Sequence, residues 1–353
     1  METGEAIVIR PIADSRLSTV NFEQLEFGKY ISDHMLVSDY ADGQWHSPRI
    51  IPFSDITLSP AALALHYGQS VFEGMKAFSL PGGKINLFRP EKHYARFMRS
   101  LERMCMPAMP EDIFIRGLEE LLKLDRDWIP SSPGSALYIR PFMFASEGRF
   151  GVKIADEYRY IVFTGPVGPA FSKPLKLKVE TRYSRAARGG TGFAKCSGNY
   201  GGAFYPTQQA RKEGFDQVIW TDAATHSTIE ESGMMNIILV INGSIVTPPL
   251  SDSILDGITR DTLLTLAKDM LIPVEEKSIS IADLQKAFEE KTITEAFGAG
   301  TAAVVSPVET IHINGIDYSL PSNLDAVMFR LKARLEDIRT GKAEDTHHWN
   351  HII

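Results

Sequence analysis

A short stretch rich in proline and glycine divides this sequence into two halves. Residues 165–174 hold three prolines and two glycines in ten positions. Proline lacks a backbone N–H and glycine loses more conformational freedom than any other residue on folding, so this stretch disfavours both a helix and a central strand. It predicts a connector at residues 165–178, between an N-terminal domain at 1–164 and a C-terminal domain at 179–353.

The first half has the pattern of an α+β domain. Residues 135–144 and 158–164 are rich in β-branched and aromatic side chains and predict strands. One helix is expected to begin near Pro90, a favoured first-turn residue, and a second spans 111–124 with an apolar stripe at helical spacing. This domain therefore combines strands with two amphipathic helices.

The second half alternates between the two kinds of element. Asn242-Gly243 is a strong signal for a two-residue hairpin turn, which favours a mixed sheet over a purely parallel one. The expected strands are 175–181, 217–221, 237–241 and 244–247, and the expected helices are 200–213, 259–270, 281–291 and 323–339.

Composition narrows the possible partners. A net charge of −7 and a pI near 5.8 argue against nucleic acid or an anionic membrane surface. The two cysteines, 105 and 196, suggest no disulfide framework, the nine histidines form no metal motif, and the start of the chain lacks the pattern of a signal peptide. A cytoplasmic protein that binds small molecules and no metal is expected.

Lys195 is the only charged residue between Gly189 and Pro206, in a segment of glycines, alanines, aromatic residues and small polar residues. Partial desolvation of such a lysine favours its neutral amine, which is the form that attacks carbonyl compounds. Exposed lysines are common, so composition alone favours a solvated side chain as the alternative.

Two further segments could bind phosphate. Residues 256–259 lead into a predicted helix whose amides and dipole suit an anion, and 297–303 form a glycine-rich stretch that could be a loop of N–H donors. Gly298-Ala-Gly300 also leaves open a dehydrogenase-like nucleotide binder, although the third glycine of that fingerprint is missing.

Taken in order, these features resemble the branched-chain amino acid aminotransferases, which are pyridoxal-phosphate enzymes of fold type IV. The resemblance runs from about residue 25 to Trp349 and rests on ten ordered motifs. They begin at Phe27-Gly with Asp33-His-Met-Leu36, and continue at 65–76, 88–90, 93–96, 138–141, 194–200, 231–236, 247–249, 257–260 and 300–303.

The resemblance implies a two-domain α+β fold, with a small α/β N-terminal domain and a larger pseudo-barrel C-terminal domain, in a homodimer with the cofactor between the domains. Lys195 would hold pyridoxal 5'-phosphate as an internal aldimine, and Glu231 would contact its pyridine nitrogen. The other implied contacts are Tyr200 to the phenolic oxygen, Arg96, Ile258, Thr259 and Thr301 to the phosphate, and Arg185 as a secondary contact.

The implied reaction is transamination of leucine, isoleucine and valine with 2-oxoglutarate to give 2-oxo acids and glutamate. Arg140 would meet the side-chain carboxylate of glutamate, and the backbone at Thr301 and Ala302 would hold the α-carboxylate. The apolar substrate pocket would be lined by Phe27, Phe72, Tyr138 and, from the partner subunit, Tyr67.

The sequence departs from the family pattern at several positions. Ala303 and Ser306 replace the redox Cys-x-x-Cys of mammalian members, and Met234 replaces a threonine near the cofactor. Ala170 stands where many members have a pocket tyrosine, and Phe171 could supply that ring. The rival families are D-amino acid aminotransferases and aminodeoxychorismate lyases, which have shorter chains and lack the motif at residues 27–36.

Overall fold

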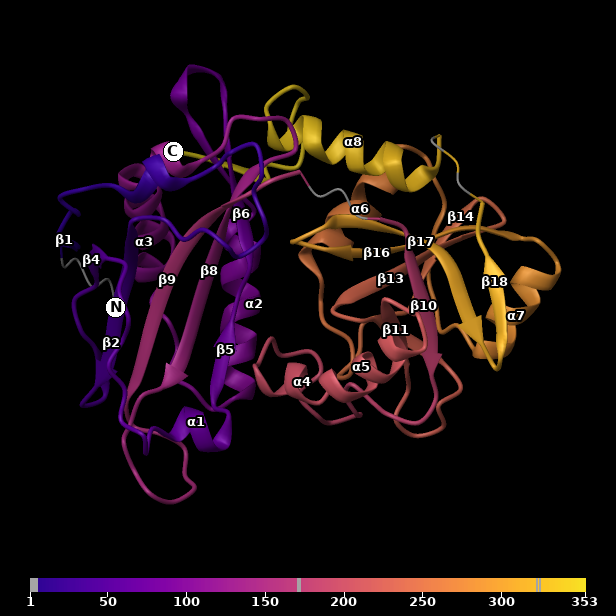
Figure 1. The fold of residues 1–353 in the computed structure, drawn as a ribbon, viewed down its shortest axis with the longest axis horizontal. Coiled ribbons are helices and arrows are strands. Elements are labelled where there is room, and N and C mark those ends of the chain that lie inside the picture. Colours follow the sequence, from indigo (N-terminus) through magenta and orange to yellow (C-terminus); the bar gives the residue numbers. More distant parts are fainter. Residues whose placement is uncertain (1–5, 170–172, 322, 324) are drawn as a thin grey trace. The chain divides into compact units, whose positions relative to one another are not determined.

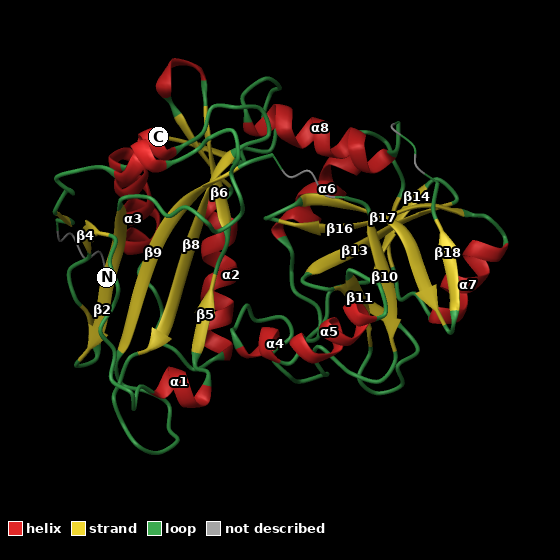
Figure 2. Cartoon of the chain, viewed as in Figure 1, coloured by secondary structure: helices red, strands yellow, loops and turns green. Residues whose placement is uncertain are grey.

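A computed structural model describes residues 6–169, 173–321, 323 and 325–353 (Figures 1 and 2). Contacts group the chain into two units, the first made of 1–169, 194–198 and 338–353 and the second of 170–193 and 199–337. The chain therefore passes from one unit to the other four times. The domain limits expected from the sequence, 1–164 and 179–353 around a connector, stay a prediction.

The first unit is built on a mostly antiparallel sheet. Among the described residues its strands follow the order β1-β4-β2-β9-β8-β6-β7-β19, with β3 paired to β2 and β5 paired to β8. The strands are β1 Val8–Ile9, β2 His34–Ala41, β3 Gln44–Trp45, β4 Arg49–Pro52, β5 Ser70–Phe72, β6 Met75–Ser79, β7 Ile85–Phe88, β8 Ala136–Ala145, β9 Tyr158–Val167 and β19 Asn350–Ile352.

Two long helices of this unit share a core with its sheet (Figure 1). The sequence predicted both: α2 begins at Pro90, and α3 has the expected bounds because its apolar stripe repeats at helical spacing. Gly117 lets α3 approach the sheet, since a Cβ there would lie 2.6 Å from a methyl carbon of Leu36. The helices are α1 Leu63–Tyr67, α2 Pro90–Arg103 and α3 Glu111–Leu124, with short 3-10 turns at Arg16–Thr19, Pro81–Gly83 and Arg126–Trp128.

The strand expected to end at residue 164 continues through Gly165 and Pro166 to Val167, so the prediction of a break at 165 was wrong there. Pro166 pairs with β8, whereas the pairing of β9 with β2 ends at Phe163. Pro166 has no N–H to donate, and its nitrogen therefore faces a side of β9 that has no neighbouring strand at this position. Gly165 is required for a separate reason, because a Cβ there would lie 2.3 Å from the Tyr30 carbonyl oxygen.

The second unit contains a closed ring of strands, which confirms the pseudo-barrel. In its described part the sheet runs β12-β11-β10-β17-β16-β13, and β12 also pairs with β13, which closes the ring. The ring is mixed, as predicted, because β10 lies parallel to β11 and β17 while the other pairs are antiparallel. Its strands, with three that pair outside the ring, are β10 Leu175–Glu180, β11 Gln217–Thr221, β12 Ile229–Ser232, β13 Met235–Ile241, β14 Ser244–Thr247, β15 Val274–Glu276, β16 Ile293–Gly300, β17 Val304–Ile313 and β18 Ile316–Ser319.

Three of the elements predicted for this unit differ in the structure. The helix predicted at 200–213 is interrupted at residues 202–203, directly after the helical Gly201, since glycine is a poor helix former. The helix predicted from residue 323 begins at Val327, where the Glu295 carboxylate accepts hydrogen bonds from the first two helical amides at 2.7 and 3.0 Å. The stretch 297–303 is strand as far as Gly300 rather than a loop. The helices are α4 Gly198–Gly201, α5 Phe204–Lys212, α6 Ile258–Asp269, α7 Ile281–Glu289 and α8 Val327–Arg339.

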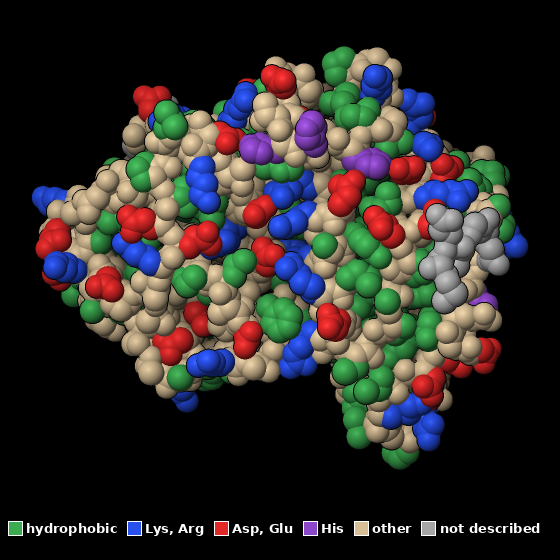
Figure 3. Space-filling view, turned by 180° about the vertical axis from the view of Figure 1, so that it is seen from behind, with side chains coloured by type: hydrophobic (Ala, Val, Ile, Leu, Met, Phe, Trp, Pro, Cys, Tyr) green, Lys and Arg blue, Asp and Glu red, His purple; other side chains and the backbone are tan. Residues whose placement is uncertain are grey.

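Apolar side chains gather on one protruding lobe of the first unit, formed by α1 and the loop at residues 146–157 (Figure 3). Phe150 is fully exposed, and Val152, Leu65 and Tyr67 are also exposed. A cluster of exposed large apolar residues is typical of a contact surface. Across the described residues, no helix has the length and apolar character needed to span a membrane.

Candidate active site

The segment around Lys195 lies against the first unit as a short extension of its sheet. The Phe72 amide in β5 donates a hydrogen bond to the Lys195 carbonyl oxygen at 3.0 Å, and the Ser197 amide donates to the Ser70 carbonyl oxygen at 3.2 Å. Between them, the buried Cys196 pairs with β5 as an isolated antiparallel bridge. The backbone that carries the lysine is therefore fixed to β5.

Helix α2 and β5 also contact Lys195 directly. Its amide donates to Oγ of the buried Ser100 at 3.0 Å, and the Ser100 hydroxyl donates to the Arg96 carbonyl oxygen at 2.9 Å. The Lys195 Nζ lies 4.8 Å from the centroid of the Phe72 ring. An ammonium at that distance from an aromatic face is attracted by the ring quadrupole, so the side chain as well as the backbone is oriented by the first unit.

A cavity of about 270 Å³ in the first unit brings together three predicted substrate residues, Phe27, Tyr138 and Arg140. The rings of Phe27 and Tyr138 meet edge to face with centroids 5.0 Å apart. The other lining residues are Gly28, Tyr30, Ile31, Phe163, Thr164, Gly165 and Val167. The cavity wall is therefore mainly apolar and aromatic, with one charged group.

Arg140 lies close to two aromatic rings. Its guanidinium carbon is 5.0 Å from the Phe72 centroid and 5.3 Å from the Tyr138 centroid, and Nη2 donates to the Tyr138 hydroxyl at 3.1 Å. Its Nε is buried and has no hydrogen-bond partner within the described ranges. Gly74 makes the arrangement possible, because a Cβ there would lie 2.1 Å from the Tyr138 hydroxyl oxygen. Arg140 therefore keeps an N–H donor for another acceptor.

Arg96, predicted to bind phosphate, belongs to a buried ion cluster that the sequence did not reveal. Its Nε and Nη2 donate to the two carboxylate oxygens of Glu73 at 2.7 and 2.8 Å, and His93 Nδ1 lies 2.8 Å from the same carboxylate. Glu73 is completely buried, and His93 and Arg96 are each 3% exposed. The only sequence signal was the three-residue spacing that places His93 and Arg96 on one face of α2.

The charges in this cluster are strongly coupled. Burial alone would raise the pKa of Glu73, but Arg96 and His93 outweigh burial and hold that pKa far below its usual value. Burial lowers the pKa of His93, and the positive charges of Arg96 and Lys195 lower it further against the opposing effect of Glu73. At neutral pH the cluster thus contains a carboxylate, a guanidinium and an uncharged imidazole.

We expect Glu73→Gln to lower the free energy of unfolding by about 3–5 kcal/mol at pH 7, because it leaves buried Arg96 without its counter-charge. A carboxyl whose pKa is depressed on folding contributes its full stability above the unfolded pKa and loses it as the pH falls toward the folded pKa. In urea unfolding, the difference between variant and wild type should therefore shrink between pH 7 and pH 3. An equal difference at both pH values would contradict this. Glu120→Gln, which removes a half-buried partner of the exposed Lys123, should cost no more than about 1 kcal/mol.

Glu231, predicted to contact the pyridine nitrogen, is a buried carboxylate in β12 of the second unit. Its Oε2 lies 2.9 Å from Arg185 Nε, and its Oε1 accepts from the Leu255 amide at 2.7 Å and from the Asn236 side chain at 3.3 Å. Arg185 Nη2 also donates to the Gly192 carbonyl oxygen at 3.0 Å. Arg185, predicted as a secondary contact to the cofactor, therefore binds Glu231 as well as the backbone, and it helps to fix the orientation of Glu231.

The predicted phosphate cradle at 256–259 is the N-terminus of α6. Ile258 and Thr259 are its first two residues, and no side chain caps the helix. The first amides of a helix have no acceptor within it, and the positive end of the helix dipole faces the same way. An anion at this position would be bound by both.

Three other predicted residues of the second unit lie in turns or in a short helix. Thr301 and Ala302 belong to the turn between β16 and β17. Tyr200 lies in α4 and lines a cavity of about 530 Å³ together with Met234, which is exposed in the turn after β12. Of the remaining residues, Tyr67 is exposed on α1 in the first unit, and positions 170 and 171 lie outside the described residues.

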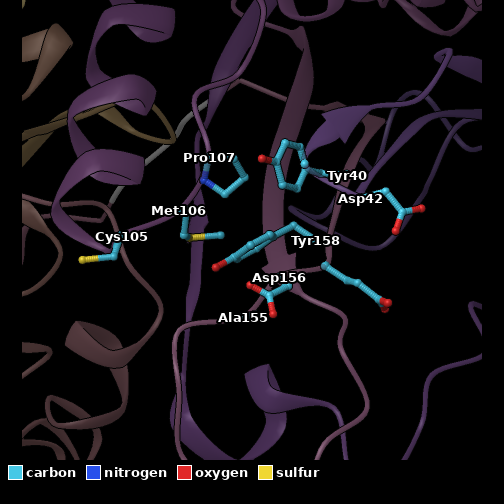
Figure 4. Close-up of a pocket in the computed structure, with 10 residues that line it drawn as sticks. Tyr40, Asp42, Cys105, Met106, Pro107, Ala155, Asp156 and Tyr158 are labelled. Atoms are coloured by element: carbon cyan, nitrogen blue, oxygen red, sulfur yellow. The ribbon is translucent and has the colours of Figure 1, made fainter.

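A further cavity of about 550 Å³ in the first unit contains none of the predicted residues (Figure 4). Tyr40, Met106 and Tyr158 contribute apolar surface, and Asp42 and Asp156 contribute charge. Burial raises the pKa of Tyr158 to about 12, so its hydroxyl stays protonated.

The structure bears on metal binding and on the dinucleotide-binding alternative. The described part of the chain holds no group of three histidine, cysteine or acidic side chains that could bind a metal ion. Gly298 and Gly300 lie within strand β16 rather than in a turn between a strand and a helix, and a Cβ at Gly298 would lie 2.6 Å from Met235 Cε. Gly298 thus permits close packing and forms no dinucleotide loop.

Comparison with known proteins agrees with this geometry. The class IV aminotransferase family matches residues 70–311. A branched-chain-amino-acid transaminase 1 of Bacillus subtilis (strain 168) is 42% identical over 331 residues, which cover 92% of this chain and 93% of that protein. A branched-chain-amino-acid aminotransferase of Mycobacterium tuberculosis (strain CDC 1551 / Oshkosh) is 41% identical over 351 residues, 97% of this chain and 95% of that protein.

Solved structures show the same relationship. A branched-chain aminotransferase from Thermoproteus uzoniensis with norvaline has a TM-score of 0.74 at 26% identity and covers 90% of this chain and 99% of its own. A branched-chain amino acid aminotransferase from Escherichia coli has a TM-score of 0.72 at 25% identity, covering 90% of this chain and 98% of its own. The chain therefore belongs to the branched-chain amino acid aminotransferases, pyridoxal-phosphate-dependent enzymes of fold type IV within the class IV aminotransferases.

Proposed function

We propose that this enzyme transfers the amino group of leucine, isoleucine or valine to 2-oxoglutarate, with pyridoxal 5'-phosphate bound covalently to Lys195. The observation that carries the choice of substrates is Arg140, a single guanidinium in an otherwise apolar cavity, with a buried Nε that has no acceptor in the described part of the chain. Such a cavity suits two kinds of side chain, one hydrocarbon and one ending in a carboxylate.

The two substrates use different parts of the same wall. Leucine, isoleucine and valine would contact the rings of Phe27, Phe72 and Tyr138, where one methylene is worth only about 1–3 kcal/mol, so all three should be accepted. The distal carboxylate of 2-oxoglutarate or glutamate would accept from the Arg140 guanidinium. A charge-assisted hydrogen bond of this kind compensates for placing a carboxylate among apolar groups.

The donor set fits the cofactor. Lys195 supplies a primary amine held near an aromatic face, Glu231 a buried carboxylate for the pyridine nitrogen, and Arg96 a guanidinium of which Glu73 occupies one edge. The amides of Ile258 and Thr259 and the Thr301 hydroxyl would add phosphate donors, and the Tyr200 hydroxyl would meet the phenolic oxygen. Bound pyridoxal phosphate supplies an electron sink that stabilises negative charge at the substrate Cα.

The protein's own groups then orient the substrate and move a proton. The Lys195 amine would act as the general base that takes the proton from the substrate Cα, and as the general acid that later gives that proton back. Glu231 would hold a proton at the pyridine nitrogen of the cofactor, and Arg185 helps to keep Glu231 in place. The backbone at Thr301 and Ala302 would hold the α-carboxylate.

A coupled assay tests this proposal. Leucine and 2-oxoglutarate are mixed with the purified protein, and glutamate is measured against samples that lack one substrate. We expect glutamate only when both substrates are present, and a visible absorbance band of the protein that borohydride removes while labelling Lys195. A colourless protein that binds no pyridoxal phosphate, or a yellow one that makes no glutamate, would contradict the proposal.

We also propose that the enzyme is a homodimer in which Tyr67 lines the pocket of the partner subunit. The support is the apolar lobe of the first unit formed by α1 and residues 146–157 (Figure 3), since Tyr67 is an exposed residue of α1. Burial of such a lobe against a second copy would remove apolar surface from water.

Replacing Phe150 and Val152 together with aspartate should therefore give a monomer by light scattering and lower kcat/KM for leucine by at least about tenfold, since each pocket would lose its partner's ring. Leu271→Asp changes an exposed leucine of the second unit and is the matched control, expected to stay dimeric and active. A double variant that stays dimeric would exclude this lobe as the interface.

A further inference from the structure

One buried hydroxyl joins the backbones of two residues that the proposed function assigns to the cofactor. Ser100 is completely buried in α2, where its Oγ accepts from the Lys195 amide at 3.0 Å and donates to the Arg96 carbonyl oxygen at 2.9 Å. We propose that Ser100 is a positioning residue that sets the distance between the Lys195 amine and the Arg96 guanidinium. This inference rests on the proposed function, in which Lys195 binds the aldehyde carbon and Arg96 the phosphate.

The arrangement follows from the geometry of α2. Arg96 and Ser100 are four residues apart, so the serine can donate to the carbonyl one turn earlier while its lone pairs point away from the helix axis. The acceptor side of the same hydroxyl meets the Lys195 segment, which is 95 residues distant in sequence. One side chain therefore uses both its donor and an acceptor site to connect the helix to the lysine.

The rest of the contacts make this link specific. The hydrogen bonds between β5 and the Lys195 segment fix how the segment lies along the sheet. They do not tie it to α2, whereas Ser100 does. Arg96 is held in turn by Glu73 through two hydrogen bonds. A change at Ser100 should thus alter the position of Lys195 relative to Arg96 and leave each residue's other contacts in place.

The binding of the cofactor is sensitive to such a change. One planar ring carries both the aldehyde and the short phosphate arm of pyridoxal phosphate, so the amine and the phosphate-binding group must lie within a narrow range of separations. A misplacement of about 1 Å in a catalytic arrangement can cost about 10²-fold in rate.

The test compares Ser100→Ala with Ser38→Ala. Ser38 is also completely buried in the first unit and donates to the His46 carbonyl oxygen at 2.9 Å, a hydrogen bond that involves none of the site residues. We expect both variants to melt at a lower temperature. Only Ser100→Ala should lower kcat by about 10–10²-fold, weaken the binding of pyridoxal phosphate to apoprotein by about tenfold, and shift the pH at which the bound cofactor's absorbance band changes.

A second pair of variants keeps the test decisive if Ser100→Ala does not fold. Ser100→Thr keeps the hydroxyl and should retain near wild-type cofactor affinity, whereas Ser100→Cys supplies a weaker acceptor and should behave like the alanine variant. Equal affinity, rate and absorbance in Ser100→Ala and Ser38→Ala, or in the threonine and cysteine variants, would overturn the inference. Failure of the wild-type apoprotein to bind pyridoxal phosphate would instead overturn the proposed function.

Discussion

Lys195 is expected to be indispensable: Lys195→Ala should lower kcat for glutamate formation from leucine and 2-oxoglutarate by at least about 10⁴-fold. The substitution removes both the amine that binds the cofactor covalently and the base that moves the proton at Cα, and proton transfer by a positioned base alone contributes about 10²–10⁴-fold. Stopped assays with wild-type and variant protein at equal cofactor occupancy measure the loss.

The structure also predicts which properties the Lys195→Ala variant should retain. The carbonyl oxygen and amide of Lys195 make the hydrogen bonds that fix its segment to Phe72 and Ser100, and these are backbone groups that alanine retains. The variant should therefore fold and still bind the cofactor without a covalent bond, and added methylamine should restore part of the activity. Lys123→Ala, on the exposed face of α3, is the control that should keep full activity. Wild-type turnover by Lys195→Ala would refute the assignment.

The second large effect is expected at Arg140, and it should be selective. Arg140→Met keeps a long apolar side chain near Phe72 but removes the partner of the distal carboxylate. A carboxylate left without its charged partner in such a pocket loses about 2–5 kcal/mol, so kcat/KM for 2-oxoglutarate should fall roughly 30-fold to several thousand-fold. For leucine, which offers no charge to this group, kcat/KM should change by less than about fivefold.

Measuring kcat/KM separately for each substrate distinguishes this role from a general loss of structure. Arg159→Met is the matched control, since Arg159 lies in the same sheet and pairs with Asp39 at 2.6 Å away from the cavity. It should affect both substrates equally and slightly. Equal losses for leucine and 2-oxoglutarate in Arg140→Met would show that Arg140 supports the pocket without binding the distal carboxylate.

Local sequence patterns were sufficient to predict the elements that depend only on residues close to one another in the sequence. Helix α3 has the predicted bounds because its apolar residues repeat with the period of a helix, and the hairpin of β13 and β14 turns at Asn242-Gly243, whose backbone adopts the positive φ angles that such a turn requires. The order of the short motifs was sufficient to predict the family, which the comparisons with known proteins confirm.

Features that depend on a distant partner could not be predicted. Pro166 is compatible with a strand only because β2 no longer pairs with β9 at that point, and the start of α8 is set by a carboxylate on β16. Glu73 gave no signal of its own, since its role arises from Arg96, 23 residues away. Ser100 likewise became informative only when the fold placed it against the Lys195 amide. Such polar contacts can be identified only when the positions of both partners in the fold are known.

The path of the chain between the two units has a consequence for recombination among relatives. A chimera that exchanged everything after residue 169 would bring along the Lys195 segment and the final strand β19, both of which belong by contacts to the first unit. The incoming lysine segment would then meet a β5 and a Ser100 from another parent, and β19 would pair with a foreign β7. A functional exchange should instead transfer residues 1–169, 194–198 and 338–353 together. These three stretches are separate in the sequence, but they should be inherited from the same parent.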